Sequence, residues 1–121
     1  MSDKVVSLQT LDDLDRVLTL SEERPVFIYK HSTACNISTG TYRDFHQYAD
    51  EADEASNIFF SEIFVIESRA VSDAVESQLG VLHQSPQMLL LTNRNVVWHT
   101  SHFDISKEAM DKALQDMQTA P

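Results

Sequence analysis

Apolar residues along the chain fall into two patterns: short unbroken runs, and runs with the spacing of a helix. An unbroken run is typical of a strand covered on both faces, because no residue of such a strand faces water. The polar segment at residues 92–95 holds two asparagines, which tolerate positive φ, and so predicts a hairpin turn. Strands are expected at residues 4–8, 26–29, 57–66, 88–91 and 96–99.

Four segments place apolar residues three and four positions apart, which predicts helices. Thr10 is expected to cap the first helix, with Asp13 in capping-box register. The second helix follows residue 35, and the third is expected to be capped by Ser72 and ended by Gly80. Ser106 is expected to cap the last. The apolar positions are Leu11, Leu14, Val17 and Leu18; Ile37, Thr41, Phe45 and Tyr48; Val71, Ala74, Val75 and Leu79; and Met110, Ala113, Leu114 and Met117.

Gly40 lies inside the second predicted helix. Glycine weakens a helix interior by about 1 kcal/mol relative to alanine. We interpret Gly40 as a point of close packing against a neighbouring element, with a functional kink as the alternative.

The predicted elements follow the order βαβαβαββα. Helical crossovers between strands favour parallel neighbours, and the closing hairpin adds an antiparallel edge. We therefore predict an α/β fold, with a central mixed β-sheet flanked by helices on both faces. This is the thioredoxin-like architecture, and residues 1–121 are expected to form a single domain of this kind.

Cys35, the one cysteine of the chain, lies where a predicted strand gives way to a helix. First-turn amides have no partner inside a helix, and the helix dipole adds partial positive charge there, which favours the nucleophilic thiolate. Cys35 and Ser38 have the spacing of a Cys-x-x-Cys pair whose second cysteine is serine. Such a site can form a mixed disulfide but no internal one. The alternative is a small buried hydrophobe, the usual role of a lone cysteine.

Ser85-Pro86 lies between a predicted helix and a predicted strand. Thioredoxin-like folds keep a cis-proline at this place, beside the cysteine loop. The backbone that precedes such a proline is free to pair with a bound thiol substrate. The alternative is an ordinary proline at the start of a strand.

Composition narrows the classes of function. The chain has 9 Lys and Arg against 19 Asp and Glu, a formal net charge of -10, which disfavours nucleic acids and anionic membranes as partners. A single cysteine excludes an internal disulfide and a cysteine-rich metal site within one chain. No signal-peptide pattern is present, and no run approaches the ~20 apolar residues of a membrane span. We expect a cytoplasmic protein whose thiols stay reduced.

Four sequence blocks, in the right order along most of the chain, resemble the monothiol bacilliredoxin family of the bacillithiol system. Members of that family carry a Cys-Pro-Ile-Ser motif. Cys35, Ile37 and Ser38 match it, whereas Asn36 stands in place of the proline that would be preorganised for the first helical turn. The blocks are residues 30–38, 65–69, 83–87 and 97–105.

The resemblance implies thiol–disulfide exchange under oxidative stress. Cys35 is the implied catalytic nucleophile, attacking a mixed disulfide between a client protein and bacillithiol, a low-molecular-weight thiol. The bacillithiol passes to Cys35, and a second thiol then resolves it. Bacillithiol is thus a co-substrate, no cofactor is expected, and the expected partners are bacillithiolated client proteins.

Several neighbours of Cys35 receive supporting roles. Thr33 is expected to cap the helix or to hydrogen-bond the sulfur. Ser38 either donates to the thiolate or fills the space of the missing thiol, and Asn36 completes the motif. Lys30 lowers the pKa of the thiol if its charge points inward, as does His31, and otherwise the two form a solvated strand end. Pro86 is expected to shape the substrate groove. The other expected groove residues are His31, Ser85 and Gln87.

Three alternatives compete with this interpretation. A non-catalytic thioredoxin-fold binding module would use the same loop and groove, and a depressed pKa of Cys35 distinguishes the enzyme from it. A carrier of an iron–sulfur cluster is disfavoured because the Cys-Gly-Phe-Ser motif is absent. His99, His102 and Asp104 are metal-ligand types, but their spacing does not provide convergent geometry, so no metal is expected.

Overall fold

The computed structural model describes residues 2–34 and 36–119, and the structural statements below concern these residues. Their strands and α-helices follow the predicted order, with two short 3₁₀ helices, η1 and η2, in addition. The elements are β1 (Val5–Ser7), α1 (Leu11–Leu20), β2 (Val26–His31), α2 (Asn36–Glu51), η1 (Glu54–Ser56), β3 (Phe59–Phe64), α3 (Arg69–Leu79), β4 (Gln87–Thr92), β5 (Asn95–Ser101), η2 (His102–Asp104) and α4 (Lys107–Thr119).

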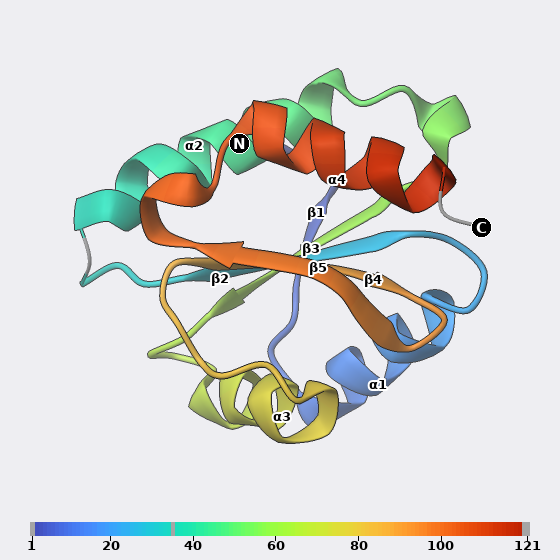
Figure 1. Ribbon diagram of the computed structural model, residues 1–121. Helices are drawn as coiled ribbons and strands as arrows, with labels where there is room; N and C mark the ends of the chain where they lie inside the picture. Colours follow the sequence, from blue (N-terminus) through green and yellow to red (C-terminus); the bar gives the residue numbers. More distant parts are fainter. Residues whose placement is uncertain (1, 35, 120–121) are drawn as a thin grey trace.

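The strands form one mixed sheet in the order β1-β3-β2-β4-β5, so the predicted fold class is confirmed. β3 lies parallel to both β1 and β2, as expected for strands joined by helical crossovers. The expectation of parallel neighbours is wrong for the third crossover, because β4 runs antiparallel to β2. The chain leaves β3, passes through α3 and returns at the same end of the sheet, so β4 begins beside the end of β2 (Figure 1).

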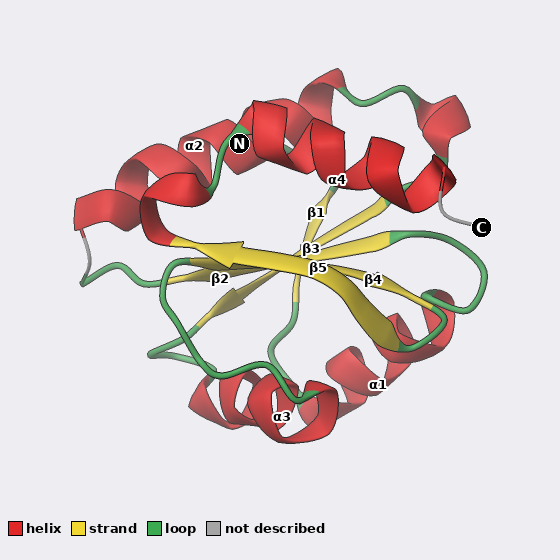
Figure 2. Ribbon diagram, viewed as in Figure 1, coloured by secondary structure: helices red, strands yellow, loops and turns green. Residues whose placement is uncertain are grey.

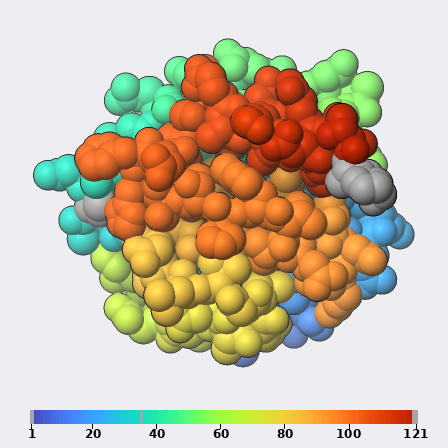
Figure 3. All heavy atoms as spheres, in the orientation of Figure 1, coloured from blue at the N-terminus to red at the C-terminus, as the bar shows by residue number. Residues whose placement is uncertain are grey.

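Helices cover both faces of the sheet. α2 and α4 lie on one face, and α1 and α3 on the other (Figure 2). β5 is an edge strand, and its side chains form the surface between α4 and the α3–β4 segment in Figure 3. Every helix among the described residues is too short or too polar to cross a membrane.

The buried strand β2 divides the core into two layers. Successive side chains of a strand point to opposite faces. Val26 and Ile28 therefore pack with residues of α1 and α3, whereas Phe27 and Tyr29 pack with residues of α2 and α4. All four are fully buried, which explains why this run shows no alternation of apolar and polar residues.

The helix ends predicted at Thr10, Ser106 and Gly80 are confirmed. Thr10 and Asp13 form the capping box of α1, and the amide of Ala109 donates to Ser106 Oγ at 3.1 Å in α4. Gly80 ends α3 with φ 72°, which glycine adopts without steric cost. The prediction that Ser72 caps α3 is wrong: α3 begins one turn earlier, at Arg69, and Ser72 is buried within the helix. The first buried apolar residue of α3 is Val71, so the apolar pattern that predicts this helix begins two residues after the helix does.

Gly40 is not a point of close packing, and that expectation is wrong. A Cβ built on Gly40 meets no heavy atom within 4 Å among its described surroundings, and the residue is exposed in α2. Replacing Gly40 by alanine is therefore expected to raise the free energy of unfolding by about 0.5–1 kcal/mol, because alanine loses less backbone entropy in a helix. Urea denaturation measures the change.

Gly80 supplies the matched control for this substitution. Its φ of 72° disfavours any residue with a Cβ, so Gly80→Ala is expected to lower the free energy of unfolding by about 1 kcal/mol. A destabilised Gly40→Ala protein would contradict the geometry described for α2.

Candidate functional site

The segment that leads from β2 into α2 carries the predicted nucleophile. Cys35 itself lies outside the described residues, so its role stays a prediction. Ser32 is buried at the start of the turn, and its Oγ accepts a hydrogen bond from the amide of Ala34 at 3.3 Å. Thr33 is exposed in this turn, and Asn36 is exposed as the first residue of α2. The residues that flank position 35 are therefore open to solvent.

Ser38 lies beneath the turn and is fully buried. Its Oγ accepts a hydrogen bond from the amide of Ser32 at 3.3 Å. The hydroxyl of Tyr29 lies 2.7 Å from Thr41 Oγ1 and donates to the carbonyl of Ser38 at 3.3 Å. The serine that replaces the second cysteine of a redox pair thus ties the turn to the first turn of the helix.

The ring of His31 is buried among aromatic side chains. Its centroid lies 4.4 Å from that of Tyr42, and Phe64 approaches edge-on at 5.5 Å. Burial lowers the pKa of His31, while the nearby Glu67 opposes the shift and His46 adds to it. His31 is therefore mainly neutral at pH 7 and supplies little positive charge toward a thiol. Its predicted place in the groove remains a prediction.

The Ser85-Pro86 peptide bond is cis. Pro86 is buried, and its carbonyl accepts a hydrogen bond from the amide of His102 at 3.0 Å. Because Gln87 pairs with Lys30 across β4 and β2, Pro86 and Ser85 lie beside the residues that follow β2. The strand register thus brings the proline segment and the cysteine segment to one end of the sheet.

Polar groups near Pro86 are left without partners. Ser85 Oγ and Gln87 Oε1 are buried and have no hydrogen-bond partner among the described residues. The side-chain nitrogen of Gln87 does have a partner, since Nε2 donates to the carbonyl of Leu82 at 3.0 Å. A buried unpaired oxygen is costly, so these two atoms mark the surroundings of Pro86 as a place with unmet hydrogen-bonding capacity.

Lys30 is fully buried, so it forms no solvated strand end. Its ammonium donates to the carbonyl of Ser72 at 3.1 Å and lies 3.1 Å from Nδ1 of His83. Burial lowers the pKa of Lys30 to about 8, while the carboxylates of Glu76 and Asp73 oppose the shift. Sequence reasoning missed the partner His83. The available signal was a lysine inside a buried strand, since fully buried lysines are almost always paired.

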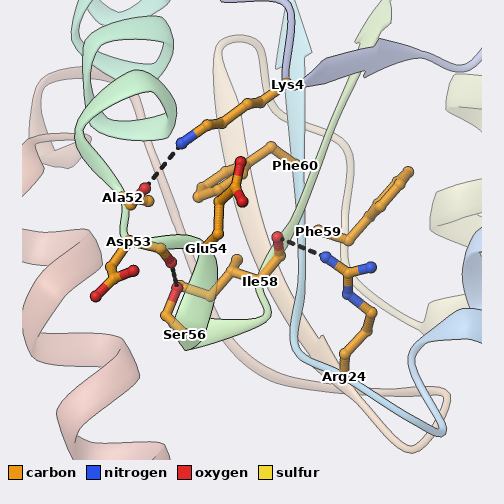
Figure 4. A pocket seen from close by; sticks show the side chains of 9 residues that line it. All are labelled: Lys4, Arg24, Ala52, Asp53, Glu54, Ser56, Ile58, Phe59 and Phe60. Atoms are coloured by element: carbon orange, nitrogen blue, oxygen red, sulfur yellow. Dashed lines mark hydrogen bonds between the residues drawn. The ribbon is translucent and has the colours of Figure 1, made fainter.

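A hollow lies at the opposite end of the sheet, and its two cations are both used in hydrogen bonds to backbone carbonyls (Figure 4). Lys4 Nζ donates to the carbonyl of Ala52 at 2.8 Å, and Arg24 donates to the carbonyls of Asn57 and Ile58 at 2.8 and 3.0 Å. Both cations therefore fix the connection between α2 and β3. The described residues also contain no group of three or more His, Cys, Asp or Glu arranged to hold a metal ion.

Known proteins resemble this chain in sequence and in fold. The chain matches the sequence profile of the family described as monothiol bacilliredoxin BrxC over residues 6–110. A solved structure described as a candidate oxidoreductase with a thioredoxin fold is similar, with 27% identity, a TM-score of 0.78, and 91% of this chain and 93% of that chain covered.

Thioredoxins share the fold at lower identity. The thioredoxin of Trypanosoma brucei brucei has 12% identity and a TM-score of 0.76, with 99% of this chain and 96% of that chain covered. The thioredoxin of Malassezia sympodialis has 15% identity and a TM-score of 0.73, with 93% and 89% covered. These two similarities establish the thioredoxin fold alone.

Proposed function

The chain belongs to the monothiol bacilliredoxin family, and on this premise we propose that it removes bacillithiol from mixed disulfides on client proteins through Cys35. Family membership and the fold support thiol oxidoreductase chemistry. The observation that supports this site is the strand register. Pairing of β2 with β4 brings the residues that follow β2 and the cis Ser85-Pro86 peptide to one end of the sheet. We place the reaction in the reducing cytoplasm, where a single thiol is kept available.

The proposed reaction is an exchange in two steps. The thiolate of Cys35 attacks the bacillithiol sulfur of the mixed disulfide, a new S–S bond forms, and the bond to the client breaks. The client leaves as a thiolate and takes a proton from water. A second thiol then attacks the disulfide on Cys35, takes the bacillithiol as a new disulfide and restores the Cys35 thiolate. The second thiol is oxidised, and the client is reduced.

The chain's own residues explain why the second thiol must come from outside. Cys35 is the one cysteine in the sequence, and the position of a resolving cysteine holds Ser38. The Ser38 hydroxyl is fully buried and accepts from the Ser32 amide. It therefore shapes the turn and cannot close an internal disulfide.

Transfer of bacillithiol to the purified protein tests the proposal. A bacillithiol-capped model protein is mixed with the reduced chain, and mass spectrometry follows both proteins. We expect Cys35 to gain one bacillithiol while the client loses one, and the Cys35→Ser variant to gain none. A glutathione-capped client, run in parallel, shows whether the cap is selected.

Absence of transfer is informative if the pKa of Cys35 is measured as well. No transfer, together with a Cys35 pKa near the ordinary ~8.5, would refute the enzyme and favour a non-catalytic binding module. Faster transfer from the glutathione cap than from the bacillithiol cap would keep the exchange reaction but replace the proposed small thiol.

A further inference from the structure

Two chain segments build the candidate site, and one buried side chain links them. Lys30 lies in β2, five residues before Cys35, and His83 lies in the α3–β4 loop, three residues before Pro86. The Lys30 ammonium lies 3.1 Å from His83 Nδ1. The same ammonium donates to the carbonyl of Ser72 within α3. One cation therefore joins the strand that leads to the cysteine, the helix before the loop, and the loop itself.

Other side chains hold the same loop from neighbouring elements. The amide of His83 donates to a carboxylate oxygen of Glu76 in α3. Gln87, which faces Lys30 across the strand pair, donates to the carbonyl of Leu82. Loop residues 81–86 would otherwise depend on solvent for these hydrogen bonds. Three side chains thus fix the approach of the chain to Pro86.

The chemistry of the contact determines the proton on His83. A lysine ammonium donates hydrogen bonds and accepts none, so Nδ1 of His83 must accept and the imidazole must be neutral. A protonated His83 would face the ammonium with like charge and no acceptor. Burial and the Lys30 charge both lower the pKa of His83, which keeps the ring neutral at pH 7.

The charges that surround this contact come from two elements. Asp73 and Glu76 of α3 raise the pKa of His83, whereas Arg69 of α3 and Lys30 of β2 lower it. The two largest causes, desolvation and the Lys30 charge, both lower the pKa of His83, and the net shift is downward. The contact is therefore intact at neutral pH and is lost on the acid side of the ordinary histidine pKa of 6.5.

We propose that Lys30 and His83 are positioning residues for thiol exchange. Their contact acts as a brace that sets the place of the cis-proline loop, residues 81–86, relative to the segment that leads from β2 into α2. The inference rests on the proposed exchange reaction. In the brace, neither side chain reacts with the sulfur atoms. Their contact fixes the groove in which the mixed disulfide must lie, so that the three sulfur atoms are in line when the thiolate attacks.

A ratio of two rates isolates this role from the acidity of Cys35. Alkylation by iodoacetamide needs the Cys35 thiolate but no groove, whereas exchange with the capped client needs both. Dividing the exchange rate by the alkylation rate at each pH cancels ionisation of the thiol. We expect the ratio at pH 7.5 to fall about tenfold in Lys30→Met and in His83→Ala, since a small misplacement of reacting groups lowers the rate by such factors.

His83→Asn is the matched variant, because the asparagine Oδ1 can accept from Lys30 in place of Nδ1 and cannot be protonated. We expect its ratio to stay within about twofold of wild type at pH 7.5, since the hydrogen bond is kept. On the acid side of pH 6.5 the wild-type ratio should fall, whereas the His83→Asn ratio should stay flat. His83 is exposed, so these variants fold even if Lys30→Met does not.

Wild-type ratios in both His83→Ala and Lys30→Met would overturn the brace. So would a drop in His83→Asn as large as in His83→Ala. Hydrogen exchange of amides 82–85 provides a readout that needs no reaction, and we expect faster exchange in His83→Ala than in wild type and His83→Asn. If the wild type transfers no cap, the proposed function fails, and unchanged protection of this loop in His83→Ala would then overturn the brace separately.

Discussion

Replacing His46 by alanine is expected to lower the free energy of unfolding by about 3 kcal/mol, because the change leaves a buried carboxylate without its hydrogen-bond donor. His46 Nε2 lies 2.8 Å from an oxygen of Glu62, and both side chains are more than nine-tenths buried. The amide of Ser2 donates to Nδ1 of His46 at 3.0 Å, so Nε2 carries a proton and donates to Glu62. The ring also packs on Tyr42, with centroids 4.3 Å apart.

A double-mutant cycle with Glu62→Gln separates the lost partner from the lost packing. Glutamine removes the charge that His46→Ala would strand, while the stacking on Tyr42 is lost in either background. We expect His46→Ala to cost at least about 1 kcal/mol less in the Glu62→Gln background than in wild type. Urea denaturation of the four proteins gives the cycle, and equal costs in both backgrounds would show that packing alone accounts for the effect.

Replacing Lys30 by methionine is expected to have the opposite effect on stability. The Lys30 ammonium is fully buried and forms no ion pair with a carboxylate of residues 2–34 or 36–119, and burial lowers its pKa from 10.5 to about 8. A shift of this size corresponds to a cost on the order of 3 kcal/mol at pH 7. Methionine fills a similar volume without charge, so we expect the free energy of unfolding at pH 7 to rise by about 1–3 kcal/mol.

The sign of the pH dependence follows from the direction of the pKa shift. Between pH 8 and 10.5 the unfolded chain binds a proton at Lys30 that the folded chain has released, so this group makes stability rise with pH. The cost of the buried charge is complete below pH 8 and is gone above 10.5. Lys30→Met has no such group, so its advantage over wild type should shrink between pH 7 and pH 10.

Urea denaturation of both proteins at pH 7 and pH 10 measures this difference. The other titratable groups are present in both proteins, so their contributions cancel in the comparison. A constant difference at the two pH values, or a variant less stable than wild type at pH 7, would contradict the assignment of Lys30 as a buried cation that lowers the stability of the fold.

The His46–Glu62 pair and Lys30 have opposite effects on the stability of the fold. His46 and Glu62 satisfy one another, and the pair stabilises the packing of α2 on β3. Lys30 costs stability, yet it links β2, α3 and the cis-proline loop. Loss of stability at a residue that connects two parts of a site is expected where function requires the arrangement. A Lys30→Met protein that is more stable than wild type but exchanges disulfides more slowly would show that Lys30 lowers stability in favour of function.

The sequence by itself determined the type and order of the elements. Unbroken apolar runs marked the central strands, and Thr10, Gly80 and Ser106 marked helix ends, because periodicity and capping depend on nearby residues. The family was also readable from its motif blocks, and the match over residues 6–110 confirms it. Ser72 was misplaced as a cap because the first two residues of α3, Arg69 and Ala70, are exposed, so the apolar pattern begins only at Val71.

Only the tertiary structure decided which residues meet. The antiparallel entry of β4 places Gln87 opposite Lys30 and brings the proline loop beside the cysteine segment. The contact of Lys30 with His83 joins residues 53 positions apart, and that of His46 with Glu62 joins residues 16 apart. Local sequence patterns do not predict contacts between residues so far apart, because strand order and the burial of each charge are set by the packing of the whole sheet.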